Sequence, residues 1–292
     1  MIVQLTANGI IAGCTYAIVA IGFTVIYGTV RFFHFAHGVV FAASAYAAWA
    51  CVTHLHLPLP LAAIVAVVAG GVLGVLIDRC VYRSLRERRS PNLILLLASF
   101  GVFLLIQNSL QLIFGSDIKV LRDGPVTEGY RVLGATITGT QIGIIISSVV
   151  LAGATVLLMR RTSFGKAIRA VADDPLAASL VGINSQRTIS YAFFVGSALA
   201  GAAGVLVALE TNVHPTMGLN AAIKGIIAAL IGGMGSIPGA LLGGLLIGLA
   251  ENVGVGGISS GWKDAIAFAI LVVFLLFRPG GIFSADLAVR KV

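Results

Sequence analysis

Long apolar runs separated by short polar stretches make up most of the chain. A helix needs about 20 apolar residues to cross the hydrocarbon core of a bilayer, and most of these runs approach or reach that length. The candidate spans are residues 5–30, 38–52, 59–81, 92–114, 138–159, 189–209, 221–253 and 265–277. The pattern predicts an all-α polytopic membrane bundle of about eight or nine transmembrane helices, forming a single transmembrane domain over residues 1–292.

The run 221–253 is too long for one ordinary span and is interrupted by turn-forming residues. Its middle reads Ile-Gly-Gly-Met-Gly-Ser-Ile-Pro-Gly at 231–239, and each remaining half is short for a full crossing. The halves are either two tilted short helices or two half-helices that meet inside the protein. Broken helices at membrane depth occur only where protein buries them or where they line a cavity.

The loops differ in charge, and Lys and Arg are retained on the cytoplasmic side of a membrane. Segments 79–89 and 160–187 are basic and lie two spans apart, so both are expected to be cytoplasmic. The charge-balanced, turn-rich loop 115–137 is expected to be external. The C-terminal end is placed inside by Arg278, Arg290 and Lys291. Nine crossings with an external N-terminus fit these signs, whereas a re-entrant loop at 221–253 would give eight or fewer.

The composition supports the membrane assignment. Of 292 residues, 58% are hydrophobic and 10% are charged, the mean hydropathy is +1.03, and soluble domains carry about 25% charged residues. The net charge of +8 is explained by the Lys and Arg residues of the loops on the cytoplasmic side. The lipid bilayer is therefore the expected partner, and nucleic acid is not. Cys14, Cys51 and Cys80 show no metal or disulfide spacing. The first run lacks a basic region and a cleavage site, so it is expected to remain in the protein.

Glycine is abundant, with 36 residues, as expected for helices that pack through small side chains. Gly9 and Gly13 form one small-xxx-small pair. A double face of the same kind is predicted at Gly239, Gly243, Gly244 and Gly248. This feature predicts close helix packing and says little about a substrate.

The basic interruption at 160–187 is predicted to form two short surface helices. The apolar face of the first helix would consist of Phe164, Ile168 and Val171, three residues at helical spacing. Asp174 followed by Pro175 is typical of a helix start. So short a second helix is unstable alone in water. The residues leave two interpretations open, an amphipathic connector on the lipid headgroups or a docking element for a cytoplasmic partner.

Three segments carry a resemblance to a known family. Residues 176–182, Leu-Ala-Ala-Ser-Leu-Val-Gly, are similar to the Ala-Ala-x-x-x-Gly core of the cytoplasmic loop through which ABC importer permeases contact their ATPases, with Leu176 at the usual Glu position. The wider stretch 165–184 resembles the branched-chain amino acid permease family (LivH-type). Segments 8–22 with Phe35-Ala-His-Gly38, and 232–249, resemble that family's N-terminal and C-terminal signatures. His34 stands where the family commonly has Asn.

The resemblance implies a permease subunit of an ATP-driven importer for branched-chain or related amino acids in a bacterial inner membrane. Such a subunit is not an enzyme and has no cofactor. Its partners would be a second permease subunit (LivM-like), two cytoplasmic ATPase subunits and an external solute-binding protein. Residues implied in ATPase coupling are Lys166, Arg169, Asp173, Asp174, Ala177, Ala178 and Gly182. Gly165-Lys166-Ala167 lacks the remaining residues of a Walker A motif, so energy must come from a partner or an ion gradient.

Polar residues inside or beside the apolar runs are candidates for a solute pathway. They are Tyr16, His34, His37, Gln107, Asn108 and Asn252. The competing interpretations are interfacial groups that reach the headgroups and interhelical hydrogen bonds. The alternative function, a gradient-driven carrier or channel, commonly requires an ionisable group at mid-membrane. Glu210 and Glu251 are expected at run ends instead. No motif of an intramembrane enzyme is present.

Overall fold

The computed structural model describes residues 1–121, 129–132 and 134–283, so part of the loop 115–137 and the C-terminal Arg290 and Lys291 lie outside it. The long helices, which can span a membrane, are α1 (Ile2–Val30), α2 (Ala36–Thr53), α3 (Leu59–Ile77), α5 (Asn92–Phe114), α6 (Gly139–Arg161), α9 (Ser185–Thr211), α11 (Ile237–Gly254) and α12 (Lys263–Phe277), which reaches that length together with the 3₁₀ turn before it. Shorter elements are a π-helical turn (Asp78–Tyr82), α4 (Arg83–Glu87), α7 (Ser163–Asp173), α8 (Pro175–Leu180), α10 (Met217–Gly232), a 3₁₀ turn (Ser260–Trp262) and the antiparallel strands β1 (Tyr130–Val132) and β2 (Ala135–Ile137).

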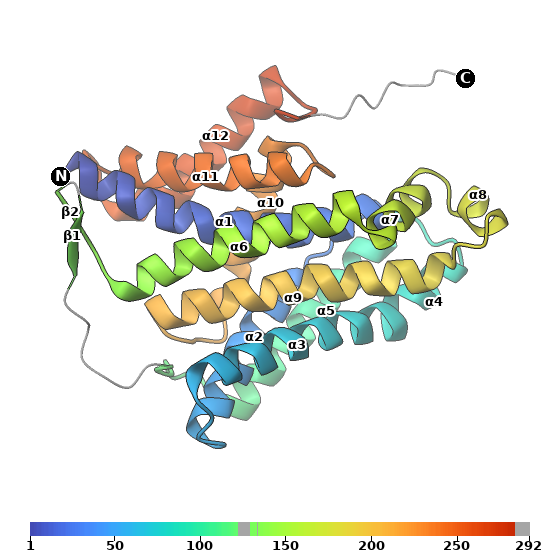
Figure 1. Cartoon of the computed structure of the whole chain (residues 1–292), viewed down its shortest axis with the longest axis horizontal. Coiled ribbons are helices and arrows are strands. Elements are labelled where there is room, and N and C mark those ends of the chain that lie inside the picture. The colour runs from blue at the N-terminus through green and yellow to red at the C-terminus, as the bar shows by residue number, and fades with distance from the viewer. Residues whose placement is uncertain (122–128, 133, 284–292) are drawn as a thin grey trace.

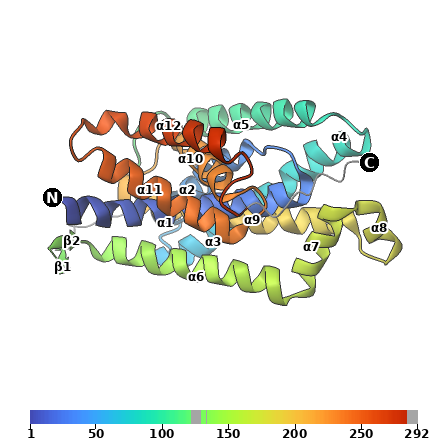
Figure 2. The same ribbon diagram turned by 90° about the horizontal axis from the view of Figure 1, so that it is seen from above.

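The predicted all-α membrane bundle is confirmed. Within the described ranges, eight helices are long and apolar enough to cross a membrane, and α10 is a shorter apolar helix. Helices α1, α6 and α9 run along the long axis of the molecule (Figure 1). Both basic segments lie at one end, with α4, α7 and α8, while the N-terminus and the β1–β2 hairpin lie at the other (Figures 1 and 2). This arrangement agrees with the orientation predicted from the charges.

Helix α1 forms the centre of the bundle. Most of its length is buried, and it packs against α9, α10 and α11. The outer helices expose apolar side chains, as a lipid-facing surface requires, and α12 buries only Ala267. The chain is therefore organised around its first helix, whose main neighbours come from the second half of the sequence.

Glycine permits a close and extensive helix contact between α1 and α11. A Cβ atom at Gly13 would lie 2.9 Å from the Cα atom of Leu245, and one at Gly9 would lie 2.9 Å from the Cα atom of Leu249. The predicted double face of α11 is divided between two neighbours. Gly244 and Gly248 face α1, whereas Gly239 and Gly243 face the end of α10.

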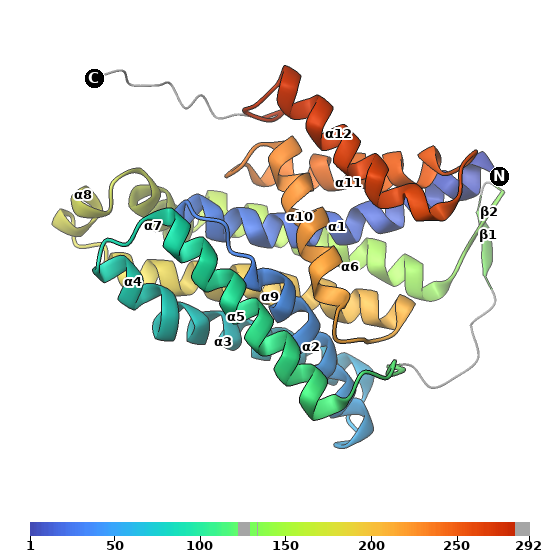
Figure 3. The same cartoon turned by 180° about the vertical axis from the view of Figure 1, so that it is seen from behind.

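The break predicted within 231–239 separates α10 from α11. Gly233 and Gly235 take positive φ values of 104° and 91° in the intervening turn, a conformation that favours glycine. Helix α10 begins at Met217, before the expected start, and crosses the bundle beside α1 and α2 (Figure 3). Its 16 residues span only about 24 Å. The backbone N–H groups of Ile282 and Phe283 donate to the carbonyls of Ile231 and Gly232, which satisfies the end of α10.

Replacing Gly248 with Leu should separate α1 from α11. The new side chain would meet the backbone of Gly9 and Gly13, and overpacking of this kind costs about 1–3 kcal/mol or more. Thermal unfolding in detergent should show a lower midpoint. The matched control is Gly153→Leu on α6, where a Cβ atom has nothing within 4 Å. Equal melting of the two variants would contradict the contact.

Candidate functional site

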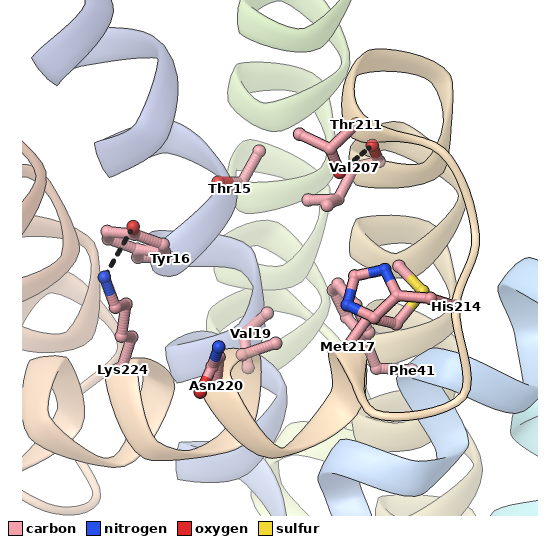
Figure 4. A pocket seen from close by; sticks show the side chains of 11 residues that line it. Thr15, Tyr16, Val19, Phe41, Val207, Thr211, His214, Met217, Asn220 and Lys224 are labelled. Carbon is pink, nitrogen blue, oxygen red and sulfur yellow. Dashed lines mark hydrogen bonds between the residues drawn. The ribbon is translucent and has the colours of Figure 1, made fainter. Parts of the chain in front are cut away.

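A cavity of about 200 Å³ lies where α10 meets α1, α2 and α9. Helix α10 contributes Met217, Asn220, Ala221 and Lys224, which are spaced i, i+3, i+4 and i+7 and so share one helix face. The remaining lining residues are Thr15, Tyr16, Val19, Phe41, Val207, Thr211 and His214. The cavity therefore combines an apolar wall with hydroxyl, amide and ammonium groups (Figure 4).

Two close backbone approaches hold α10 in this position. Gly218 packs against the backbone of Gly38 on α2, and Gly225 packs against Val19 on α1. Because neither glycine has a side chain, α10 can lie across both helices and direct its polar face between them. The loop before α10 is held by a pair of backbone hydrogen bonds between Val213 and Lys119, each 2.8 Å long.

An ion-pair cluster closes one end of the cavity. The Lys224 ammonium lies 2.8 Å from Glu251 Oε2 and 3.0 Å from Asp264 Oδ1. It also donates to the hydroxyl oxygen of Tyr16 at 3.3 Å, and that hydroxyl donates to Glu251 Oε2 at 3.0 Å. Beside them, Lys263 donates to the Asn252 amide oxygen at 2.9 Å. Helices α1, α10, α11 and α12 thus meet through charged groups at this point.

Glu251 lies near the end of α11, as predicted, but the expectation that a group at the end of a run reaches the membrane interface is wrong for its side chain. Its side chain is fully buried and paired with Lys224, whose side chain is 13% exposed. By contrast, Glu210 remains near the surface and accepts a hydrogen bond from Gln141. The gradient-driven alternative needs an ionisable group at membrane depth. Glu251 is buried inside the bundle, but Lys224 pairs with it at 2.8 Å, so it is not a free carboxylate.

Of the six candidate pathway residues, Tyr16 lines this cavity and the other five lie elsewhere. His34 and His37 are buried around the start of α2, where their ring nitrogens lie 3.0 Å from the Tyr82 hydroxyl and 3.2 Å from the Val19 carbonyl. Asn108 bonds to its own helix, through the carbonyl of Leu104. Gln107 is half-buried on the same helix, and Asn252 bonds to Gly248 and Lys263.

Sequence reasoning missed most of the cavity. Asn220, Thr211 and Thr15 were not singled out, although the helical spacing of Met217, Asn220, Ala221 and Lys224 is visible in the sequence. This pattern was missed because α10 begins at Met217, before the expected start of the apolar run at residue 221.

Helices α7 and α8, which the charge pattern predicts to be cytoplasmic, form a second candidate site, which we call the docking knob (163–182). The predicted apolar face of α7 packs inward, with Ile168 and Val171 buried. Asp174 caps α8 by accepting hydrogen bonds from the N–H groups of Leu176 and Ala177 at 2.8 and 3.1 Å. The hydroxyl of Ser185 donates to the Pro175 carbonyl and ties α8 to α9.

The predicted coupling residues occupy different environments in the docking knob. Arg169 donates to the carbonyl of Met159 at 2.6 Å and so braces α7 against α6. Ala178 is buried, and Gly182 takes a φ of 84° after α8. Apart from Ala178, all the predicted coupling residues are exposed, including Arg169 and Gly182. Three apolar residues not predicted as coupling residues are the most exposed, with Leu176 at 77%, Leu180 at 88% and Val181 at 76%.

Comparison with known proteins gives a consistent result over nearly the whole chain. The family model described as branched-chain amino acid transport system / permease component matches residues 5–275. The chain is 37% identical to the high-affinity branched-chain amino acid transport system permease protein BraD of Pseudomonas aeruginosa, over 96% of this chain and 95% of the relative. It is 37% identical to the LivH permease of Escherichia coli K12, over 95% and 94%. For LivH of Salmonella typhimurium the identity is 36%, with the same coverage.

Replacing Lys224 with Met should destabilise the protein because it leaves the buried Glu251 carboxylate without its partner. Breaking a buried ion pair from one side costs about 3–5 kcal/mol. The double variant Lys224→Met/Glu251→Gln should recover most of that loss, since it removes both charges. Thermal unfolding of the two variants measures the difference. A double variant no more stable than the single one would show that the pair is not the source of the cost.

Proposed function

This chain belongs to the permease family of branched-chain amino acid transport systems, and on that premise we propose that it moves branched-chain amino acids through the cavity beside α10. It is a membrane subunit of an ABC transport system and not an enzyme. In the proposed assembly it pairs with a second permease subunit. Two cytoplasmic ATPase subunits supply energy, and an external solute-binding protein delivers the amino acid.

The observation that carries the ATPase assignment is the exposed apolar face of α8. Leu176 and Leu180 on α8, and Val181 directly after it, are exposed. Helix α8 lies at one end of the bundle, beside α7 (Figure 1). An exposed apolar patch with polar surroundings is typical of a protein contact. Two turns of helix cannot be stable alone, and the Asp174 cap and the bond from Ser185 supply the support that keeps this face presented.

The cavity suits a small amino acid with an apolar side chain. Val19, Phe41, Val207 and Met217 offer apolar surface, while Thr15, Thr211 and Asn220 offer hydrogen-bonding groups near it. Weak contacts of this kind serve a transport path, because the solute must leave again. The proposal assigns ATPase coupling to the residues of the docking knob that the sequence predicted for it, namely Lys166, Arg169, Asp173, Asp174, Ala177, Ala178 and Gly182.

Replacing Leu180 with Asp should prevent the ATPase subunits from co-purifying while leaving membrane insertion intact. The Leu180 side chain is 88% exposed, so the substitution changes the docking surface without disturbing the fold. Ala178 is unsuitable for this test because it is buried. We expect ATP-driven uptake of leucine to fall to the background level in proteoliposomes.

The matched control is Leu55→Asp, at a leucine that is 65% exposed in the loop after α2, at the opposite end of the bundle. This variant should assemble and transport normally. Full ATPase binding by the Leu180→Asp variant would remove α8 as the docking element. Leucine flux through the permease reconstituted without any ATPase would overturn the proposed function itself.

A further inference from the structure

We propose that Lys224 recognises the carboxylate of the transported solute, and that Asp264 occupies the same ammonium group between transport events. The inference rests on the proposed function and deepens it, because it states which chemical group a solute must carry. It would restrict the path to small apolar solutes with a carboxylate and exclude neutral amides, urea and sugars.

Lys224 is placed to act on a solute in the cavity. Among the eleven residues that line the cavity, it alone carries a fixed positive charge. It stands at one end of the space beside Tyr16, opposite the apolar residues around Met217 and Phe41 (Figure 4). A carboxylate that reached this end would find a charge-assisted donor, and such hydrogen bonds are roughly twice as strong as neutral ones.

The ammonium group already has a full set of acceptors. Its three protons are directed at Glu251, Asp264 and the Tyr16 hydroxyl, at 2.8, 3.0 and 3.3 Å. A solute carboxylate can therefore bind only by displacing one of them. Which acceptor is displaced depends on how deeply each one is buried and what else it bonds to.

Displacing Glu251 from Lys224 would cost a large free energy. Its side chain is fully buried and also accepts a hydrogen bond from Tyr16, so losing Lys224 would leave a charge stranded inside the bundle. Asp264 is different because its side chain is 62% exposed. An ion pair with an exposed partner contributes little, and water can solvate the released carboxylate.

The position of Asp264 in the fold also favours exchange. It lies in the first turn of α12, the helix with the fewest buried residues among the long helices described. The neighbouring Lys263 is bonded to Asn252 and holds the start of α12 independently. Asp264 can therefore leave Lys224 without detaching the helix. Its carboxylate keeps the ammonium paired when no solute is present.

The test uses a reporter cysteine in the cavity of the assembled permease–ATPase complex, without the binding protein. Ala221→Cys is introduced in a Cys80→Ser background, since Cys80 is the exposed native cysteine and Cys14 and Cys51 are buried. The rate of alkylation by N-ethylmaleimide is measured with leucine or leucinamide. The amide keeps the side chain and the ammonium group but has no carboxylate.

We expect leucine to slow alkylation and leucinamide to need at least about a tenfold higher concentration for the same effect, the size expected from a charge-assisted hydrogen bond. Lys224→Met/Glu251→Gln should abolish the difference, and Lys224→Arg should keep it. Asp264→Asn should lower the leucine concentration that gives half-protection, because it removes the competing charge.

Equal protection by the two compounds with Lys224 intact would overturn the recognition role while leaving the cavity as the path. Discrimination that survives in the double variant would overturn it as well. A higher half-protecting concentration in Asp264→Asn would overturn the role of Asp264. Absence of protection by any solute would instead count against the cavity as the path, and with it against the proposal.

Discussion

The fold depends on the close approach of α1 and α11 through glycine. In a bilayer, an interrupted helix and a charged side chain are tolerated only where protein encloses them. The contact of Gly9 and Gly13 with α11 brings together the central helix and the second half of the broken pair. The Lys224–Glu251 pair and the end of α10 are enclosed as a result. Without this packing, neither the cavity nor its charged end would be enclosed by protein.

A single element joins the two candidate sites. Helix α9 begins directly after the docking knob, where Ser185 bonds to Pro175, and it ends at Thr211, beside the cavity. Near the N-terminal end of α9, Ser190 donates to the buried Asp78, which also pairs with Arg86. The π-helical turn after α3 is thereby fixed to the same helix. A displacement of α8 would reach α9 through the short turn 181–184 and the Ser185 hydrogen bond, and α9 is continuous from there to the cavity.

Apolar run length and turn chemistry were sufficient to predict the spans, the break before α11 and the cap at Asp174, because these depend on neighbouring residues. The cavity could not be predicted in the same way, since Tyr16 and Lys224 are 208 positions apart and meet only through glycine contacts. Glu251 shows the limit most clearly. Nearness to the end of an apolar run suggested exposure, but the fold covers that turn of α11 with three other helices.

The hydrogen bonds that close α10 connect it to the last described residues of the chain. Ile282 and Phe283 satisfy carbonyls of Ile231 and Gly232, and the first helix needs α11 to fill its glycine face. Both requirements link early segments to late ones. During synthesis, α1 therefore keeps an unfilled glycine face until α11 has emerged. Assembly of this subunit is accordingly a late event, governed by the arrival of its carboxyl-terminal third.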